Sequence, residues 1–393
     1  MKVLILHQHF STPVSGGPLR SYYLAKALVE EGFDPVVITA HSESQYRIEH
    51  YKGIEIHYLP VPYNNRFNFY KRSVSFMRYI YQATRLAAKF RDAKICYAMS
   101  VPLTVGLAAM WIRRRYSIPF IFEVGDLWPD APVELGIIKN RFFKQALFAL
   151  EKKIYQSALS VVALSPAIKS AVEQKVPGTI VHLIPNMADT DFYKPSLKDA
   201  KLEKKFGVTG RFVVAYIGAV GIANGLDYLV ECARGCEKAS LPVYFLICGD
   251  GAMLDTLKRT AKVLGLQNLA FIPFQNRMGV REVLNITDAA FISYKSFPIL
   301  ETGSPHKFFD GLAAGKLMII NFSGWIREEI ERHHCGFACD PGNPEDFVSK
   351  ITPFLSDPEK LKQYQASARL LAETAYSRRA LGEHFADLIR LGA

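Results

Sequence analysis

One stretch in the last third of the chain combines glycine, hydroxyl, lysine and carboxylate groups within ten residues. It reads Glu301-Thr-Gly-Ser-Pro-His-Lys-Phe-Phe-Asp310, and an apolar-periodic helical pattern begins inside it. A helix that starts after a Gly-Ser turn has unpaired N–H groups and a positive dipole end, which suit a phosphate. Lys307 would lie in the first helical turn, where a cation does not stabilise the helix, so an anionic ligand would explain it. The stretch predicts an anion site, although an ordinary capped helix fits it equally well.

Two further turns carry glycines between an expected strand and an expected helix. The first, His7–Pro18, contains Gly16 and Gly17, and the second runs from Gly218 to Leu226. Glycine lets a diphosphate approach the backbone closely at the start of a helix. The first turn lacks the Gly-x-Gly-x-x-Gly spacing and the ribose-binding acid of a nicotinamide site, so that cofactor is not expected. Each turn alone fits a flexible loop, but both together with the Lys307 helix favour a diphosphate site.

Acidic residues follow the strand that we expect over residues 119–124. The run Glu123-Val-Gly125-Asp126-Leu-Trp128-Pro129-Asp130 lies at the carboxyl end of that strand. Ligands bind at this edge of parallel sheets, so we expect these acids to point towards a ligand and not into the core. Asp126 is the candidate for orienting an acceptor or a sugar. Trp128 could pack under a sugar ring, although a place in the core is the simpler explanation.

Two short motifs are reminiscent of metal sites. Asp189-Thr-Asp191 has the D-x-D form, but it falls in a connector away from any strand end. Cys335 and Cys339 follow two histidines, but their spacing is unusual for zinc and no second Cys/His cluster accompanies them. Neither motif predicts a metal centre.

The elements that would position these residues alternate between short β-rich runs and helical patterns. Such alternation predicts α/β domains, in which a parallel sheet is covered on both faces by helices. Residues 187–200 look like a linker between two such domains, which would leave a cleft between the carboxyl ends of their strands. The expected strands are 2–8, 35–39, 54–59, 94–98, 119–124, 159–164, 180–184, 212–217, 243–248, 269–272, 289–293 and 317–320.

Length and composition agree with two folded domains. The chain has 393 residues, of which 49% are hydrophobic and 22% charged, as in globular proteins. Met1–His7 is too short an apolar run for a signal peptide, and the longest apolar stretch, 99–112, is too short to cross a bilayer. The six cysteines are then most simply reduced thiols in the cytoplasm.

Basic and aromatic side chains concentrate in the first half of the chain. Residues 66–115 hold 11 basic residues and one acid, and residues 63–81 hold seven aromatic residues. Anionic lipid head groups attract each such base by about 1 kcal/mol, and aromatic rings favour the interface. Nucleic acid is not expected because no recognition fold accompanies the bases, and a solvated helix face over core aromatics is the alternative. The candidates for an acceptor or membrane surface are Arg66, Lys71, Arg72, Arg78, Tyr79 and Trp128.

Four segments, in order along the chain, together resemble the family 4 glycosyltransferases, which have the two-domain GT-B fold. They are Ser15-Gly16-Gly17, Ile184 through Phe192, Gly218 through Leu226 and Glu301 through Gly315. The runs Glu123–Pro129 and Gly303–Gly315 are most similar to the bacterial surface-polysaccharide branch, which includes N-acetyl-fucosamine and related amino-sugar transferases.

The resemblance implies two Rossmann-like domains, residues 1–186 on the acceptor side and 201–375 on the nucleotide-sugar side. We expect the last helix, about 376–393, to pack back on the first domain. The implied enzyme is a retaining hexosyltransferase with a nucleotide-diphosphate sugar, UDP-linked and N-acetylated in this branch, and without a tightly bound metal or other cofactor. Its catalytic residues would be Asp126, Glu301 and Lys307. Its donor-binding residues would be Gly16, Gly17, Gly218, Gly221, Asn224, Gly225, Arg277, Thr302, Gly303, Ser304, Pro305 and Asp310.

This sequence departs from the family pattern at an acidic pair and at a strand end. The family often has two glutamates eight residues apart, and Thr302 and Asp310 stand in their places. Asp310 can still hold ribose hydroxyls, and the adjacent Glu301 could replace the missing acid by binding sugar hydroxyls. Gly125 stands where the family usually has a histidine or an arginine.

A further departure concerns the charge of the donor diphosphate. Ala219 and Asn224 occupy positions where the family often has an arginine and a lysine. Lys307 and the amides of the glycine-rich loop would then have to neutralise the diphosphate, with Arg277 as another candidate.

We expect the acceptor to be a polyprenyl-diphosphate-linked saccharide in O-antigen or capsule synthesis. The protein would then be cytoplasmic and peripheral, at the inner face of the bacterial inner membrane. Two other functions stay open. One is a nucleotide-sugar 2-epimerase on a similar fold, and the other is a non-catalytic membrane-associated scaffold, which the missing acid and missing bases would fit.

Overall fold

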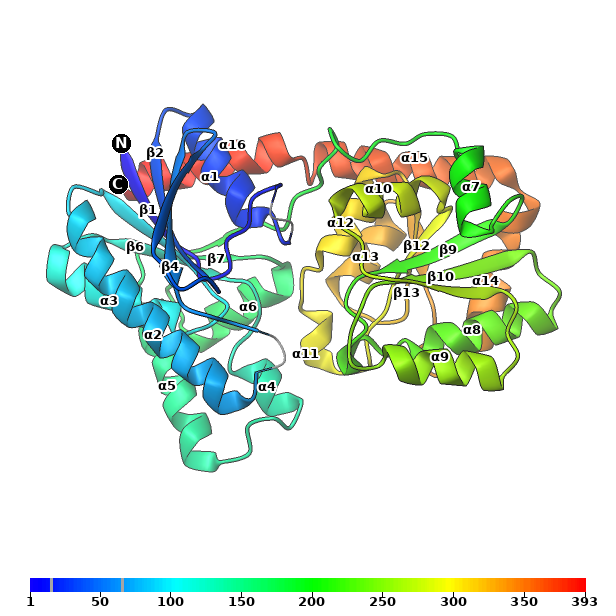
Figure 1. The fold of residues 1–393 in the computed structure, drawn as a ribbon, viewed down its shortest axis with the longest axis horizontal. Helices are drawn as coiled ribbons and strands as arrows, with labels where there is room; N and C mark the ends of the chain where they lie inside the picture. Colours follow the sequence, from blue (N-terminus) through cyan, green and yellow to red (C-terminus); the bar gives the residue numbers. More distant parts are fainter. Residues whose placement is uncertain (15–16, 65–66) are drawn as a thin grey trace. The chain divides into compact units, whose positions relative to one another are not determined.

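The computed structural model describes residues 1–14, 17–64 and 67–393, so the candidates Gly16 and Arg66 lie outside the described residues. The chain divides into two compact units. Unit 1 comprises Met1–Asn186, Thr302–Ser304 and Arg379–Ala393, and unit 2 comprises Met187–Glu301 and Pro305–Arg378. Each unit has a β-sheet with helices on both faces (Figure 1). The prediction of two α/β domains is confirmed.

Unit 1 is built on an eight-stranded sheet with the order β3-β4-β2-β1-β5-β6-β7-β8. All neighbouring strands are parallel except β3, which runs antiparallel to β4 at the edge. The central strands β5 and β6 bury every side chain, as expected for strands that helices cover on both faces. The strands are β1 (Lys2–Leu6), β2 (Asp34–His41), β3 (Arg47–Tyr51), β4 (Ile54–Pro60), β5 (Ile95–Met99), β6 (Phe120–Val124), β7 (Ser160–Ala163) and β8 (Val181–Leu183).

The helices of unit 1 connect these strands, and one more helix joins from the far end of the chain. Helix α2 packs against α3, and α3 packs against α5. Most of α16 (Arg378–Gly392) belongs to this unit, and its Phe385 ring packs edge-on against Tyr97 of β5 with 4.7 Å between centroids. The other helices are α1 (Arg20–Glu30), α2 (Phe69–Ala87), α3 (Val105–Tyr116), α4 (Asp130–Glu134), α5 (Arg141–Ser157) and α6 (Pro166–Lys175), with a 3-10 turn η1 (Ala88–Phe90).

Unit 2 is built on six parallel strands in the order β11-β10-β9-β12-β13-β14. Its strands are β9 (Phe212–Ile217), β10 (Val243–Cys248), β11 (Leu269–Ile272), β12 (Ala289–Ile292), β13 (Leu317–Ile320) and β14 (Gly336–Ala338). Its helices are α7 (Ala200–Phe206), η2 (Ile222–Asn224), α8 (Asp227–Lys238), α9 (Leu254–Val263), α10 (Arg277–Ile286), α11 (Pro298–Glu301), α12 (His306–Ala313), α13 (Trp325–Arg332), α14 (Pro344–Ser356) and α15 (Pro358–Thr374).

Helix α12 follows β12 and carries the Lys307 stretch. Phe308 and Phe309 are completely buried and pack against Trp325 and Tyr376. Each fully buried phenylalanine contributes roughly 1.5–3 kcal/mol, so this pair fixes the rotation of the short helix. The fixed rotation leaves Lys307, the residue before the pair, free of the core and directed at the carboxyl edge of the sheet.

Candidate active site

The Lys307 amine lies against the glycine-rich loop that follows β9. Its Nζ donates a 2.7 Å hydrogen bond to the Tyr216 hydroxyl and stands 4.1 Å from the centre of that ring. A Cβ placed on Gly218 would come within 3.2 Å of the same Nζ. The Tyr294 ring lies on another side of the amine, at 5.7 Å. We call Tyr216, Gly218, Tyr294 and Lys307 the lysine site, and two of its members, Gly218 and Lys307, are sequence-predicted.

The surroundings of the lysine site change the acidity of its amine. Lys307 is half-buried, and this burial lowers its pKa to about 7, because removal from water disfavours the charged form. The Tyr216 hydroxyl donates to the Ala219 carbonyl at 2.7 Å, so its oxygen is available to accept from Lys307. No carboxylate forms an ion pair with Lys307 among the residues that the structure describes. Such an amine gains its counter-charge when an anion binds.

The loop after β9 offers fewer amide donors than its sequence predicts. Three of its N–H groups already have partners, so an anion cannot use them without breaking a hydrogen bond. The loop therefore contributes space beside Gly218, and Lys307 carries the positive charge. The three bonds run from Gly218 to the Cys248 carbonyl (2.9 Å), from Val220 to the Asp250 carbonyl (2.8 Å) and from Gly221 to the Asn224 side chain (3.1 Å).

A second glycine pair, after β10, supports this loop from the neighbouring strand. Gly249 and Gly251 have φ values of +151° and +159°. A Cβ on Gly249 would stand 1.9 Å from the Gly218 carbonyl oxygen, and one on Gly251 would stand 2.3 Å from the Val220 oxygen. Only glycine permits so close an approach. Sequence reasoning missed this pair, although Gly-Asp-Gly directly after a buried strand was the available signal.

Asp310, one turn after Lys307, has a separate environment. Its burial raises the pKa of the carboxyl to about 7, with Arg277 opposing and Asp189 reinforcing the rise. Arg277 forms an ion pair with Asp189 and covers the Phe192 ring at 3.6 Å from its centroid. The guanidinium that we considered for the diphosphate is thus already paired with a carboxylate. Arg378 donates to the other Asp189 oxygen at 3.0 Å. The first aspartate of the D-x-D motif therefore forms ion pairs with two arginines.

The residues between β12 and α12 divide between the two units. Glu301 is the last residue of α11 and is half-buried. It lies against Gly324, which precedes α13 and has a φ of +94°. The Thr302 carbonyl accepts from Ser165 at 2.6 Å, and the Ser304 carbonyl accepts from Asn186 at 2.5 Å. Gly303 lies between these two anchored residues, and Pro305 immediately precedes α12. No described residue hydrogen-bonds the Glu301 carboxylate, so its role in sugar binding stays a prediction.

In unit 1 the acids in and after β6 have different environments. Asp126 is exposed at the strand's carboxyl end, as expected, whereas Glu123 is 2% exposed and points into the core. Arg20, in the first turn of α1, binds both Glu123 carboxylate oxygens at 2.8–3.0 Å. Asp130 pairs with Lys175 at 2.5 Å. The expectation that all three acids face a ligand is wrong for Glu123, because a buried arginine 103 residues away neutralises it.

Other predicted residues of unit 1 are scattered. Trp128 is half-buried, and Gly17 is exposed with a φ of +101°. In α2, Lys71 and Arg78 are exposed and Arg72 is half-buried. Tyr79, predicted to contact an acceptor or membrane, is instead fully buried, and its hydroxyl donates to the Ile38 carbonyl at 2.7 Å. That prediction is wrong because Tyr79 faces the sheet, where its ring fills the core.

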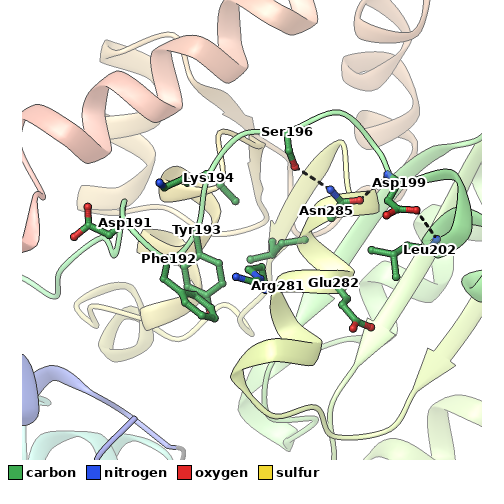
Figure 2. A pocket seen from close by; sticks show the side chains of 12 residues that line it. Asp191, Phe192, Tyr193, Lys194, Ser196, Asp199, Leu202, Arg281, Glu282 and Asn285 are labelled. Atoms are coloured by element: carbon green, nitrogen blue, oxygen red, sulfur yellow. Dashed lines mark hydrogen bonds between the residues drawn. The ribbon is translucent and has the colours of Figure 1, made fainter.

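A cavity of about 420 Å³ lies in unit 2 beside the segment that leads into α7, and Figure 2 shows its lining. None of the lining residues is among the sequence-predicted site residues. The Asn285 side chain donates to the Ser196 hydroxyl (2.9 Å) and accepts from the Asp199 backbone N–H (2.8 Å). Both ends of this side-chain amide therefore bond to other residues of the cavity lining. The cavity is therefore distinct from the lysine site.

Sequence comparisons match both units to known domain families. Residues 15–187 match the model for a glycosyl transferase 4-like domain, and residues 198–371 match that for glycosyl transferases group 1. The chain belongs to the GT-B glycosyltransferases. Its lysine site falls within the second matched region, and Asp126 falls within the first.

Solved structures similar to this glycosyltransferase share its fold along the whole chain. Sucrose-phosphate synthase from Thermosynechococcus elongatus has a TM-score of 0.79 at 15% identity and covers 99% of this chain and 98% of its own. HepE from Anabaena, in complex with UDP and glucose, has a TM-score of 0.72 at 17% identity, with both chains fully covered. WaaG, a glycosyltransferase involved in lipopolysaccharide biosynthesis, has a TM-score of 0.69 at 16% identity, covering 98% and 99%.

Among curated proteins, alpha-D-kanosaminyltransferase from Streptomyces kanamyceticus is 20% identical over 247 residues. The alignment covers 61% of this chain and 62% of that relative's length.

Proposed function

We propose that this glycosyltransferase moves an N-acetylated hexosamine-type sugar from a UDP-linked donor to a lipid-linked saccharide, with retention of anomeric configuration. Family membership supports the transfer reaction. The choice of UDP draws support from the similar HepE structure, which was solved with UDP and glucose. The amino-sugar donor and the lipid-linked acceptor follow from the branch resemblance of the runs around Asp126 and Lys307.

The observation that carries the proposal is the Lys307 amine beside Gly218, at the edge of the sheet where α/β folds bind ligands. Lys307 lies in the first turn of α12, where a positive charge does not stabilise the helix. In the structure it meets a glycine with no side chain in the way and no carboxylate as a partner among the described residues. A diphosphate provides the missing negative charge, and Asp310 in the same helix suits the ribose hydroxyls.

The reaction that we propose occurs on one face of the donor sugar. The bond between the anomeric carbon and the diphosphate oxygen breaks, and the acceptor hydroxyl oxygen bonds to the same carbon from the same side. The leaving phosphate takes the acceptor's proton, so no nucleophilic carboxylate is needed. Protonated Lys307 stabilises the charge that grows on the diphosphate in the transition state. Asp126 orients the acceptor, and Glu301 binds sugar hydroxyls.

Helix α2 supports a membrane-bound acceptor. Its exposed apolar residues recur at spacings of four, three and four, which places them on one helix face. Lys71, Arg78 and Arg85 are exposed on the same helix and would meet anionic head groups. No helix in the described part of the chain is long and apolar enough to span a bilayer, and contact through α2 requires none. The apolar face consists of Tyr70 (74% exposed), Val74 (49%), Met77 (56%) and Tyr81 (59%).

A ligand panel followed by a transfer assay tests the proposal. UDP and UDP-sugars should raise the melting temperature, whereas GDP and its sugars should not, because a ligand that binds only the folded state stabilises it. Transfer to a lipid-linked saccharide should persist after EDTA treatment and should keep the donor's anomeric configuration by NMR. Conversion of UDP-sugar without any acceptor would favour an epimerase, and the absence of nucleotide binding would favour a scaffold.

A further inference from the structure

A second apolar surface of unit 1 lies outside α2, in the connection from α4 to α5. Ile137 is 67% exposed and Phe142 is 80% exposed, and the neighbouring Phe143 is 41% exposed. These three large exposed apolar side chains lie within seven residues of one another, and such concentrations on a surface often mark a binding site. We call residues 137–144 the apolar tip.

The backbone of the apolar tip is held in place by hydrogen bonds. The N–H groups of Ile137 and Ile138 both donate to the Pro132 carbonyl, at 2.9 and 3.0 Å, and Ile138 is buried. The Asn140 side chain accepts from the Phe143 amide at 2.9 Å and caps α5. Ile137 and Phe142 are therefore exposed to solvent on a backbone that hydrogen bonds hold in place.

The charge around the apolar tip has one sign. Between residues 135 and 150 the chain has three bases, Lys139, Arg141 and Lys144, and no acid. Lys139 and Arg141 are exposed, and none of the three forms an ion pair with any residue that the structure describes. An anionic bilayer has negative head groups at its surface and apolar chains beneath them. The bases of the tip would meet the head groups, and its apolar side chains would meet the acyl chains.

The apolar tip belongs to the connection that leaves the carboxyl edge of the sheet of unit 1 after β6. In a parallel sheet each connecting helix starts at the carboxyl edge of the preceding strand, so α2, after β4, and α5, after β6, both begin there. The two helices share one layer, with α3 between them, and Figure 1 shows that layer. Asp126 follows β6 by two residues and lies at the same edge.

We infer that the apolar tip inserts Ile137 and Phe142 into an anionic lipid bilayer, as a second membrane contact besides α2. The inference rests on the proposed lipid-linked acceptor, but it concerns a separate segment and can fail alone. Lys139, Arg141 and Lys144 bind the head groups, while the two apolar side chains enter the acyl region. The contact orients unit 1 with its acceptor edge towards the membrane surface.

The test uses the full-length protein and vesicles of phosphatidylglycerol and phosphatidylcholine, with and without brominated acyl chains. Brominated lipid should quench Phe142→Trp more than wild type, whose three native tryptophans set the background fluorescence. Leu197→Trp is the matched control, because Leu197 is 93% exposed in unit 2 and should not be quenched. The double variant Ile137→Ala/Phe142→Ala should bind vesicles at least tenfold more weakly by sedimentation, a loss of about 1.4 kcal/mol. Its melting temperature and its activity on a soluble acceptor should match wild type.

The outcomes separate the two proposals. If wild-type protein does not sediment with the vesicles at all, both the proposed membrane association and the tip inference are refuted. If it sediments but brominated lipid quenches Phe142→Trp no more than wild type, the tip inference is overturned and the contact through α2 stands. If Ile137→Ala/Phe142→Ala instead changes a dimer into a monomer by light scattering, the tip is an interface between copies and the inference is again overturned.

Discussion

The lysine site predicts that donor binding weakens as the pH rises through neutrality. Burial lowers the pKa of Lys307 to about 7, and a bound diphosphate would restore the charged form by raising that pKa. The free protein then holds the charged amine at low pH and loses it above about pH 7. Every further pH unit leaves about tenfold less of the binding-competent form.

The magnitude follows from the fraction of Lys307 that is protonated. That fraction falls from about nine-tenths at pH 6 to about three-hundredths at pH 8.5, so affinity should drop about thirtyfold, or about 2 kcal/mol. The assay is isothermal titration calorimetry with a UDP-sugar. Free UDP is unsuitable, because its terminal phosphate titrates in the same pH range.

Two variants of Lys307 isolate its contribution. Lys307→Met should bind the donor at least tenfold more weakly and without the pH dependence, because methionine carries no charge. Lys307→Arg should bind with little pH dependence, since arginine stays protonated throughout. A wild-type affinity that is flat from pH 6 to 8.5, or an undiminished slope in Lys307→Met, would refute the reasoning. Near-normal turnover in Lys307→Met would remove the lysine from the phosphate role.

Three other perturbations test the structure. Lys307→Met should raise the free energy of unfolding by at least about 1 kcal/mol at pH 8 and by more at pH 6, because burial lowers the folded-state pKa of the amine below its unfolded value. This destabilisation by Lys307 is complete below about pH 7 and is lost as the pH rises towards the unfolded pKa, and calorimetry at pH 6 and pH 8 measures it. Gly218→Ala should lower UDP-sugar affinity at least about fivefold, since its Cβ meets the amine; unchanged affinity would contradict that contact. Arg20→Met should cost about 3–5 kcal/mol by leaving Glu123 charged and buried, and adding Glu123→Gln should recover part of it in urea denaturation.

The sheets could be predicted from sequence because their strands are buried apolar runs. β1, β5 and β9 read as strands without any knowledge of their neighbours. β3 escaped because it is an edge strand whose side chains are mostly exposed, so it lacks an apolar pattern. α11, with four residues, is too short to show a helical period.

The lysine site could be predicted in part. Gly218 and Lys307 each carried a local signal, and the parallel pairing of β9 with β12 brings their loops to one edge. Glu123 had the same kind of local signal as Asp126, yet its partner Arg20 is far away in sequence. Tyr79 illustrates the same limit, because the identity of a helical residue does not tell which face meets the sheet. Such errors arise where a contact distant in sequence decides the orientation.

The return of α16 to unit 1 has a consequence for how the protein is made. Unit 1 needs Phe385 against Tyr97, Gly382 against Ala27 and Gly392 against Ile95, and these last helical residues are translated only after all of unit 2. During synthesis, the apolar surface of unit 1 that α16 covers therefore stays exposed until unit 2 has been translated. A chaperone that holds nascent apolar surface would therefore act on the first unit longer than its place in the gene suggests. A chain released before residue 379 would keep that face exposed and be a substrate for proteolysis.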